Sequence, residues 1–355
     1  MKVLKFGGTS VGSPERIKSV SNLIADGQPK IVVFSAMSGT TNSLIEIADY
    51  FSRKNSEAAN NIINQLQRKY ESHVLELYSE DKTIQKSKKL LAEIFDLLRS
   101  FSNKEVGERE HKYIVAQGEI ISTNLITNYL LENGVKALLI PALDYMKLNE
   151  NEEPDMSYIK EKLSNFLNAN AGYDLYITQG FICRDYTGEV SNLQRGGSDY
   201  TACIIGAVLK SDEIQIWTDI DGMHNNDPRI VDHTSPVRQL NFEEAAELAY
   251  FGAKILHPTC IQPARYAGVP VKLLNTMDPS APGTIINNKI EKGCIKAVAA
   301  KDNITAIKIV SSRMLLATGF LRKVFEIFET YKTPVDMVTT SEVGVSFSID
   351  NTSHL

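Results

Sequence analysis

The chain has 355 residues and a formal net charge of −5, and 43% of its residues are hydrophobic. At roughly 150 residues per domain, this length predicts two domains and a sizeable core. The acidic balance argues against a nucleic-acid-binding protein, and no apolar run approaches the roughly 18 residues of a membrane span, which argues against a membrane protein.

The N-terminus and the cysteines indicate the cellular compartment and the state of the thiols. The N-terminus has no signal-peptide pattern, so we expect a cytoplasmic protein. Cys183, Cys203, Cys260 and Cys294 are widely spaced and form no C-x-x-C pair. We therefore expect free buried thiols rather than a zinc site or a disulfide framework.

The first predicted elements are a strand, a glycine turn and a helix. Residues 2–6 form a short apolar strand that leads into Gly7-Gly8, and Ser13-Pro14 has the residue types that begin a helix. The amides of such a turn and of a helix N-terminus attract anions, and Lys5 adds a full positive charge. The spacing matches neither a Walker A loop nor a Rossmann fingerprint, so the loop by itself indicates an anion site or an ordinary tight turn.

The following elements predict an α/β fold with a mostly parallel sheet. An apolar strand at residues 31–34 precedes a polar loop at 35–42, and residues 43–131 are predicted to be mostly helical. Four more buried strands are predicted, at residues 136–140, 175–179, 214–218 and 269–274. Their alternation with helices is typical of a parallel sheet covered on both faces. Polar loops follow several strands, at the sheet edge where ligands bind, although the aspartates in 218–222 are equally plain turn formers.

A second glycine pair, Gly196-Gly197, precedes an apolar helix at residues 200–209, which Ser198 can cap. Arg195 can grip a carboxylate in a bidentate fork, and Asp199 suits a cation or a lysine as its partner. A capped helix after a turn explains the serine and the glycines but explains the two charged residues poorly.

A further helix is expected at residues 241–256, where Asn241 and Glu244 have the spacing of a capping box. Lys254 near its end has an ordinary alternative as an exposed partner of the helix dipole. Glu119 is equally explained as a charge on a helix face.

A second unit begins near residue 295. A strand at 304–310, a helix at 319–331 and a strand at 343–349 are too short together to bury a core of their own. We therefore predict a first domain at residues 1–294 and an incomplete second domain at 295–355.

Taken in order, the polar loops resemble those of the amino-acid kinase superfamily, and most closely those of the aspartokinases. The resemblance covers essentially the whole chain. Its motifs are Lys5–Val11, Ser35–Asn42, Gly118-Glu119, Gly180-Phe181, Arg195–Asp199, Thr218–Gly222, Asp227–Arg229 and Phe251–Pro258.

The resemblance implies a three-layer αβα sandwich with a mostly parallel central sheet. It also implies transfer of the γ-phosphoryl group of ATP, with Mg²⁺, to the β-carboxylate of L-aspartate, which gives 4-phospho-L-aspartate for lysine, threonine and methionine synthesis. A carboxylate acceptor is already ionised at pH 7 and needs no general base. Positioning and positive charge are what phosphoryl transfer requires.

The resemblance assigns the phosphoryl side of the site to two lysines and a glycine turn. Lys5 and Lys254 would neutralise the moving phosphoryl group, and Gly7 and Gly8 would donate amides to it. Asp199 would hold the lysines in place.

The resemblance assigns the two ends of the amino acid to opposite charges. Arg195 would bind the α-carboxylate of aspartate and Glu119 its ammonium group. The pocket would be lined by Ser35, Thr41, Phe181 and Ser198.

The nucleotide is also assigned by resemblance. Its contacts would be Lys5, Gly7, Gly8, Ser10, Thr218, Asp219, His224, Arg229 and Lys254. His224 stands where aspartokinases often carry Tyr, and its imidazole could still stack on adenine.

The tail resembles the start of the ACT regulatory region of lysine-sensitive aspartokinases. The positions that would contact the lysine effector, at an interface between two subunits, are Met314, Val335, Asp336, Thr340 and Ser341. Family members continue through two ACT units, so we expect a truncated chain with impaired lysine feedback. Unpaired strand edges favour a homodimer or a higher homo-oligomer.

Two alternatives stay open at this point. Related kinases act on glutamate or acetylglutamate, but the tail and the complete lysine-containing motifs disfavour them. A catalytically idle amino-acid sensor or assembly subunit would have no reason to keep both lysines, Asp199 and the charges for the amino acid.

Overall fold

A computed structural model describes residues 1–193, 196–227, 230–251, 256–291, 293, 295–311, 314 and 318–350. Its contacts divide the chain into two compact units, Met1–Val298 and Ala299–Leu355. The predicted boundary, between residues 294 and 295, lies shortly before this division.

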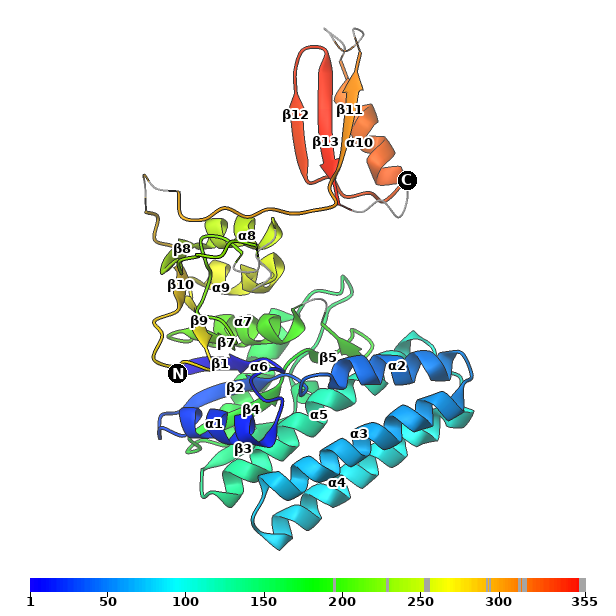
Figure 1. Cartoon of the computed structure of the whole chain (residues 1–355), viewed down its shortest axis with the longest axis vertical. Coiled ribbons are helices and arrows are strands. Elements are labelled where there is room, and N and C mark those ends of the chain that lie inside the picture. Colours follow the sequence, from blue (N-terminus) through cyan, green and yellow to red (C-terminus); the bar gives the residue numbers. More distant parts are fainter. Residues whose placement is uncertain are drawn as a thin grey trace. The chain divides into compact units, whose positions relative to one another are not determined.

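The first unit is built on an eight-stranded sheet among the described residues, with strand order β3-β4-β2-β1-β7-β9-β10-β8 (Figure 1). The first six of these strands pair in parallel, which confirms the predicted α/β fold; β10 is antiparallel to β9, and β8 is parallel to β10. The strands are β1 (Lys2–Phe6), β2 (Lys30–Phe34), β3 (Ala137–Ile140), β4 (Leu175–Gln179), β7 (Ile214–Thr218), β8 (Gln239–Asn241), β9 (Val271–Asn275) and β10 (Thr284–Asn287).

Helices cover both faces of this sheet because the central strands are apolar on both sides. All five residues of β2 and all five of β4 are buried. One face is covered by α1 (Pro14–Ile24), α2 (Thr40–Ser52) and α5 (Glu108–Glu132), and α3 (Ser56–Leu77) and α4 (Asp81–Arg99) pack against these helices. The other face packs with α6 (Met156–Ala169), α7 (Gly197–Leu209), α8 (Phe242–Tyr250) and α9 (Gln262–Ala267).

Alternation along β1 sorts its side chains between these two layers. Leu4 and Phe6 belong to the core on the α5 side, whereas Val3 belongs to the core on the α7 side. Since successive strand residues point to opposite faces, Lys5 points to the same side as Val3, toward α7.

Several predicted boundaries are corrected by the structure. The helix expected at 241–256 ends at Tyr250, and Leu256 lies in a bend. Helix α7 begins at Gly197 with Gly196 as its N-cap, so Ser198 lies inside the first turn and is not the cap. Strands β8 and β10 were not predicted, and neither was the hairpin of β5 (Ile182–Arg184) and β6 (Val190–Asn192).

The second unit is a small antiparallel sheet with one helix. Strands β11 (Thr305–Val310), β13 (Gly344–Ile349) and β12 (Met337–Thr340) pair in the order β11-β13-β12, and α10 (Phe320–Thr330) joins them. The buried cluster contains only Val324, Val345 and Phe347 among the described residues. Strand β12 was not predicted, because all four of its residues are exposed and its sequence has no burial pattern.

The cysteine prediction agrees with the described part of the chain. Cys183 and Cys203 are free and buried, as expected, and Cys260 is buried too, while Cys294 lies outside the described residues. None of the helices described combines the length and the apolarity that crossing a bilayer requires.

Helix starts follow the residue types that the sequence offers. Ser13 caps α1, with Pro14 at its first position. At α8, the Asn241 side chain accepts a hydrogen bond from the Glu244 N–H, and the Glu244 carboxylate accepts one from the Asn241 N–H, both at 2.8 Å. The predicted capping box is therefore confirmed.

We expect Asn241→Ala to lower the free energy of unfolding by about 1 kcal/mol, because the first turn of α8 loses its side-chain acceptor. Asn241→Ser keeps an acceptor and should retain most of that stability. The free energy of unfolding of both variants is measured in urea, with the fluorescence of Trp217, the single tryptophan, as the signal. Equal midpoints for the alanine variant and the parent chain would contradict the role of this cap.

Candidate active site

The carboxyl ends of four neighbouring strands meet at one edge of the sheet. In the registers of β1, β2, β4 and β7, Phe6 lies beside both Phe34 and Trp217, and Phe34 lies beside Gln179. The loops that follow these strands therefore leave the sheet side by side. Such an edge is where open α/β sheets bind their ligands.

A cavity of about 240 Å³ lies at this edge. Seven of the side chains predicted for the site line it, together with the backbone of the second glycine pair. The lining residues are Lys5, Ser35, Thr41, Glu119, Phe181, Gly196, Gly197, Ser198 and Asp199.

An ion pair between Lys5 and Asp199 forms one wall of the cavity. Lys5 Nζ lies 2.7 Å from Asp199 Oδ1, and the two side chains are only 12% and 13% exposed. Asp199 lies in the first turn of α7, where the helix dipole favours a negative charge. The pair links the middle of β1 to the start of a helix far along the chain.

The first glycine turn approaches a neighbouring loop closely. A Cβ added to Gly8 would lie 2.7 Å from the Ala36 carbonyl oxygen, and the Ser38 N–H donates a hydrogen bond to the Gly8 carbonyl at 3.1 Å. A Cβ added to Gly7 would lie 3.4 Å from Lys5 Nζ. Glycine is needed at position 8 because a side chain there has no room.

Glu119 of α5 brings a buried carboxylate to the cavity. Its Oε1 accepts a hydrogen bond from the Ala36 N–H at 3.2 Å, while its Oε2 has no hydrogen-bond partner in the described part of the chain. Desolvation raises the pKa of this carboxyl to about 7, although the bond from Ala36 acts in the opposite direction. A carboxylate oxygen without a partner suits a cationic group of a ligand.

Among the described residues, the other nucleotide candidates are not part of the lining of this cavity. Ser10 is buried, and its Oγ shares a hydrogen bond of 2.8 Å with Thr276 Oγ1 beside α1. Thr218 Oγ1, at the end of β7, donates to Asp219 Oδ1 at 3.1 Å. His224 Nδ1 shares a hydrogen bond of 2.8 Å with Thr234 Oγ1.

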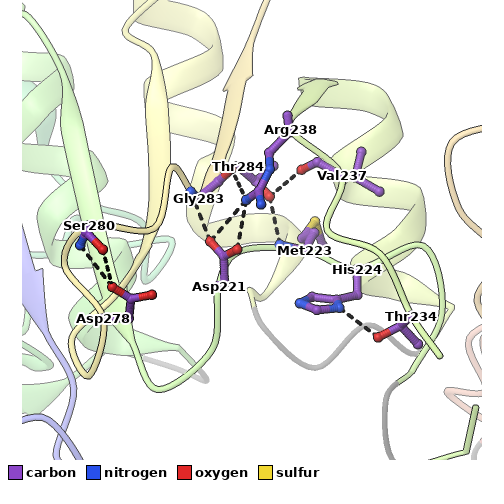
Figure 2. A network of polar contacts seen from close by, with 10 residues as sticks. All are labelled: Asp221, Met223, His224, Thr234, Val237, Arg238, Asp278, Ser280, Gly283 and Thr284. Carbon is purple, nitrogen blue, oxygen red and sulfur yellow. Dashed lines mark hydrogen bonds and ion pairs between the residues drawn. The ribbon is translucent and has the colours of Figure 1, made fainter. Parts of the chain in front are cut away.

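Figure 2 shows a network around Asp221 that the sequence did not reveal. Arg238 Nη1 donates to both oxygens of Asp221, at 3.1 and 2.9 Å, and the Gly283 N–H donates to Oδ1 at 3.0 Å. Nearby, Thr284 Oγ1 accepts from the Met223 N–H at 2.8 Å. Asp221 therefore fixes the loop that carries His224.

Three predicted site residues, Arg195, Arg229 and Lys254, lie outside the described residues. The predicted effector positions lie in the second unit. Met314 and Val335 pack against its small core, and Thr340 is exposed at the end of β12. The backbone N–H groups of Asp336 and Ser341 donate hydrogen bonds to carbonyls of β13.

The sequence profile of the Amino acid kinase family matches residues 1–275. That match spans most of the chain and contains every residue of the cavity. The chain therefore belongs to the amino acid kinase family.

The relatives narrow this assignment. Aspartokinase 1 of Arabidopsis thaliana is 38% identical over 98% of this chain and 63% of its own length, and the lysine-sensitive aspartokinase 3 of Escherichia coli is 34% identical over 99% and 78%. The crystal structure of E. coli aspartokinase III in complex with aspartate and ADP matches with a TM-score of 0.83 at 32% identity, over 99% of this chain and 79% of that one. Within the family, the chain is a member of the aspartokinases. It spans less than two thirds of the length of the Arabidopsis relative.

We expect Glu119→Gln to stabilise the protein without ligands at pH 8 by roughly 3 kcal/mol. The folded pKa near 7 lies above the ordinary value of 4.5, so the folded protein holds a proton that the unfolded chain releases. Stability of the parent chain therefore falls as pH rises from about 4.5 to 7. Glutamine imitates the neutral acid and removes that loss.

Denaturant unfolding at pH 5 and pH 8 measures this effect, and the difference between variant and parent should shrink at pH 5 to roughly a quarter of its value at pH 8. The control is Glu108→Gln, which changes an exposed carboxylate of the same helix that pairs with Lys112. A Glu119→Gln variant that is less stable than the parent at pH 8 would mean that the carboxylate is stabilised as an anion.

Proposed function

We propose that this chain transfers the γ-phosphoryl group of ATP to the β-carboxylate of L-aspartate. The observation that carries the proposal is the pairing of opposite charges in one cavity. The shielded Lys5–Asp199 pair and the unpartnered oxygen of Glu119 both line it. Membership of the aspartokinases supports this substrate class.

The amino-acid end of the site would recognise the ammonium and α-carboxylate groups of aspartate by their opposite charges. Glu119 would accept the ammonium group of aspartate, which compensates the cost of burying the ionised carboxylate. Arg195 would hold the α-carboxylate as a bidentate partner. Ser35, Thr41, Phe181 and Ser198 would surround the rest of the substrate and leave the β-carboxylate directed toward Lys5.

The chemical step needs charge and alignment rather than proton transfer. An oxygen of the ionised β-carboxylate attacks the γ-phosphorus, the bond from that phosphorus to the bridging oxygen breaks, and ADP leaves with the electron pair. Lys5 and Lys254 would stabilise the negative charge on the phosphoryl oxygens, and the amides of Gly7-Gly8 would add hydrogen bonds. Asp199 would keep Lys5 directed into the cavity.

The nucleotide would lie over the neighbouring strand ends. Ser10, Thr218, Asp219, His224 and Arg229 are its proposed contacts. Among the described residues, no group of three or more His, Cys, Asp or Glu side chains is gathered as a metal cage. Mg²⁺ keeps several waters and binds chiefly through substrate phosphates, so it would enter with ATP and neutralise phosphate charge there.

The second unit is proposed to be the beginning of an ACT-type regulatory region that responds to lysine. One helix over a three-stranded sheet with a very small core suits a module that packs against a second subunit. Met314, Val335, Asp336, Thr340 and Ser341 are its proposed effector positions.

The activity is tested by trapping its product. The protein is incubated with ATP, Mg²⁺, L-aspartate and hydroxylamine, which converts an acyl phosphate into a hydroxamate. Aspartyl hydroxamate that depends on both substrates is the expected result. Absence of hydroxamate from folded protein would exclude the kinase activity, and formation from glutamate alone would assign a different substrate.

We expect Lys5→Ala to lower kcat at least roughly 10²- to 10³-fold, the usual loss when one charge-stabilising donor is removed. The matched control is Lys2→Ala. Lys2 lies on the same strand, but its side chain is 54% exposed, and its Nζ lies 3.9 Å from Glu213 Oε1. Steady-state rates of both variants at saturating substrates make the comparison, and near-parental turnover of Lys5→Ala would remove Lys5 from the mechanism.

A further inference from the structure

Phe181, a wall of the cavity, has an unusual backbone conformation. Its φ is 68°, in the left-handed region that bulky residues rarely adopt. The Ile182 N–H donates to the Gly180 carbonyl at 2.7 Å, so Phe181 is the centre of a three-residue γ-turn. A γ-turn with positive φ at its centre is rare and strained. Such a conformation persists only where its surroundings fix it.

The surroundings of Phe181 fix it from several directions. Its carbonyl accepts a hydrogen bond from the Leu193 N–H at 2.7 Å. A Cβ added to Gly197 would lie 2.5 Å from Phe181 Cδ2, and one added to Gly180 would lie 2.5 Å from Ser198 Cβ. The turn is therefore packed directly against the first residues of α7.

The last backbone group of Phe181 is satisfied by a single hydroxyl. The Phe181 N–H donates to Thr201 Oγ1 at 3.1 Å, and the same hydroxyl donates to the Gly197 carbonyl at 2.8 Å. Thr201 is completely buried. The bond to Gly197 is the ordinary i−4 bond of a helical threonine. Because the hydroxyl proton points to Gly197, a lone pair of Thr201 Oγ1 faces the Phe181 N–H. The Thr201 side chain therefore joins the γ-turn to the first turn of α7.

We propose that Thr201 is a positioning residue that sets the depth of the amino-acid end of the cavity. The inference rests on the proposed function, because it concerns how closely that site fits aspartate. Thr201 itself does not line the cavity, whereas Phe181, Gly197, Ser198 and Asp199 do. It acts by holding the Phe181 ring at a fixed distance from the helix that carries Ser198 and Asp199.

Loss of the hydroxyl leaves a buried N–H without a partner and removes one of the contacts that hold the strained turn. The turn then relaxes, and the ring of Phe181 no longer has a fixed place beside Gly197. An acid one methylene longer than aspartate gains room, while aspartate loses a close contact. Neither Phe181 nor Thr201 is among the proposed nucleotide contacts, so ATP binding is expected to be unaffected.

The test compares Thr201→Val, which has nearly the same shape but no hydroxyl, with Thr201→Ser, which keeps the hydroxyl. The matched control is Thr127→Val on α5, a buried threonine whose hydroxyl donates to the Thr123 carbonyl at 2.7 Å in the same i−4 manner. The hydroxamate assay gives kcat and KM for aspartate, glutamate and ATP with each protein.

For Thr201→Val we expect KM for aspartate to rise roughly 10- to 100-fold, as for one buried donor left unsatisfied. The preference for aspartate over glutamate in kcat/KM should fall, while KM for ATP stays within about twofold. Thr201→Ser and Thr127→Val should resemble the parent. A general loss of structure would instead change the KM values for aspartate, glutamate and ATP together.

Parental KM and selectivity in Thr201→Val would overturn the proposal, and so would an equal effect of Thr127→Val. If Thr201→Val does not fold, Thr201→Ala removes the same hydroxyl with less crowding. Failure of both to fold beside a folded Thr201→Ser would overturn the positioning role in favour of a structural one. A parent chain without product from either acid would instead overturn the proposed function.

Discussion

The ion pair between Lys5 and Asp199 is the interaction on which the arrangement of the site depends. It forms only if β1 lies in the middle of the sheet with its odd-numbered residues facing α7, and only if α7 begins at the carboxyl edge of the strands. A lysine this shielded from water needs a partner, and Asp199 at a helix N-terminus supplies one at little cost. Sheet order, strand alternation and helix start thus combine to hold one positive charge at the place where a phosphate would arrive.

Close approaches of backbone to backbone and of side chain to backbone give the cavity its shape. Gly8 beside Ala36, Gly180 beside Ser198 and Gly197 beside Phe181 leave no space for a Cβ. Glu119 completes the cavity with a carboxylate that is costly to ionise before a cation arrives. The site therefore gives up some stability of the free protein for complementarity to a small molecule that carries opposite charges.

The sequence predicted the parallel sheet well because its strands are short apolar runs, buried on both faces, that end in polar loops. It missed β8, β10, β12 and the β5–β6 hairpin, which are short or exposed and have no such pattern. The residue types alone left ordinary alternatives for the glycine turn after Lys5 and for the charge of Glu119. Only the ordered resemblance joined Lys5, Glu119 and Asp199 into one site. The γ-turn at Phe181 and the role of Thr201 could not be predicted, since phenylalanine does not signal a positive φ and a helical threonine usually bonds only to its own helix.

The central claim is that a phosphoryl group becomes attached to the β-carboxylate of aspartate in front of Lys5. The most direct measurement is ¹³C NMR of L-aspartate labelled at the β-carboxyl carbon, incubated with the protein, ATP and Mg²⁺. The account predicts a new signal of the labelled carbon that is split by coupling to ³¹P. Its intensity grows in step with the amount of ADP. ADP formation without this coupling, or no change in the labelled carbon at all, would contradict it.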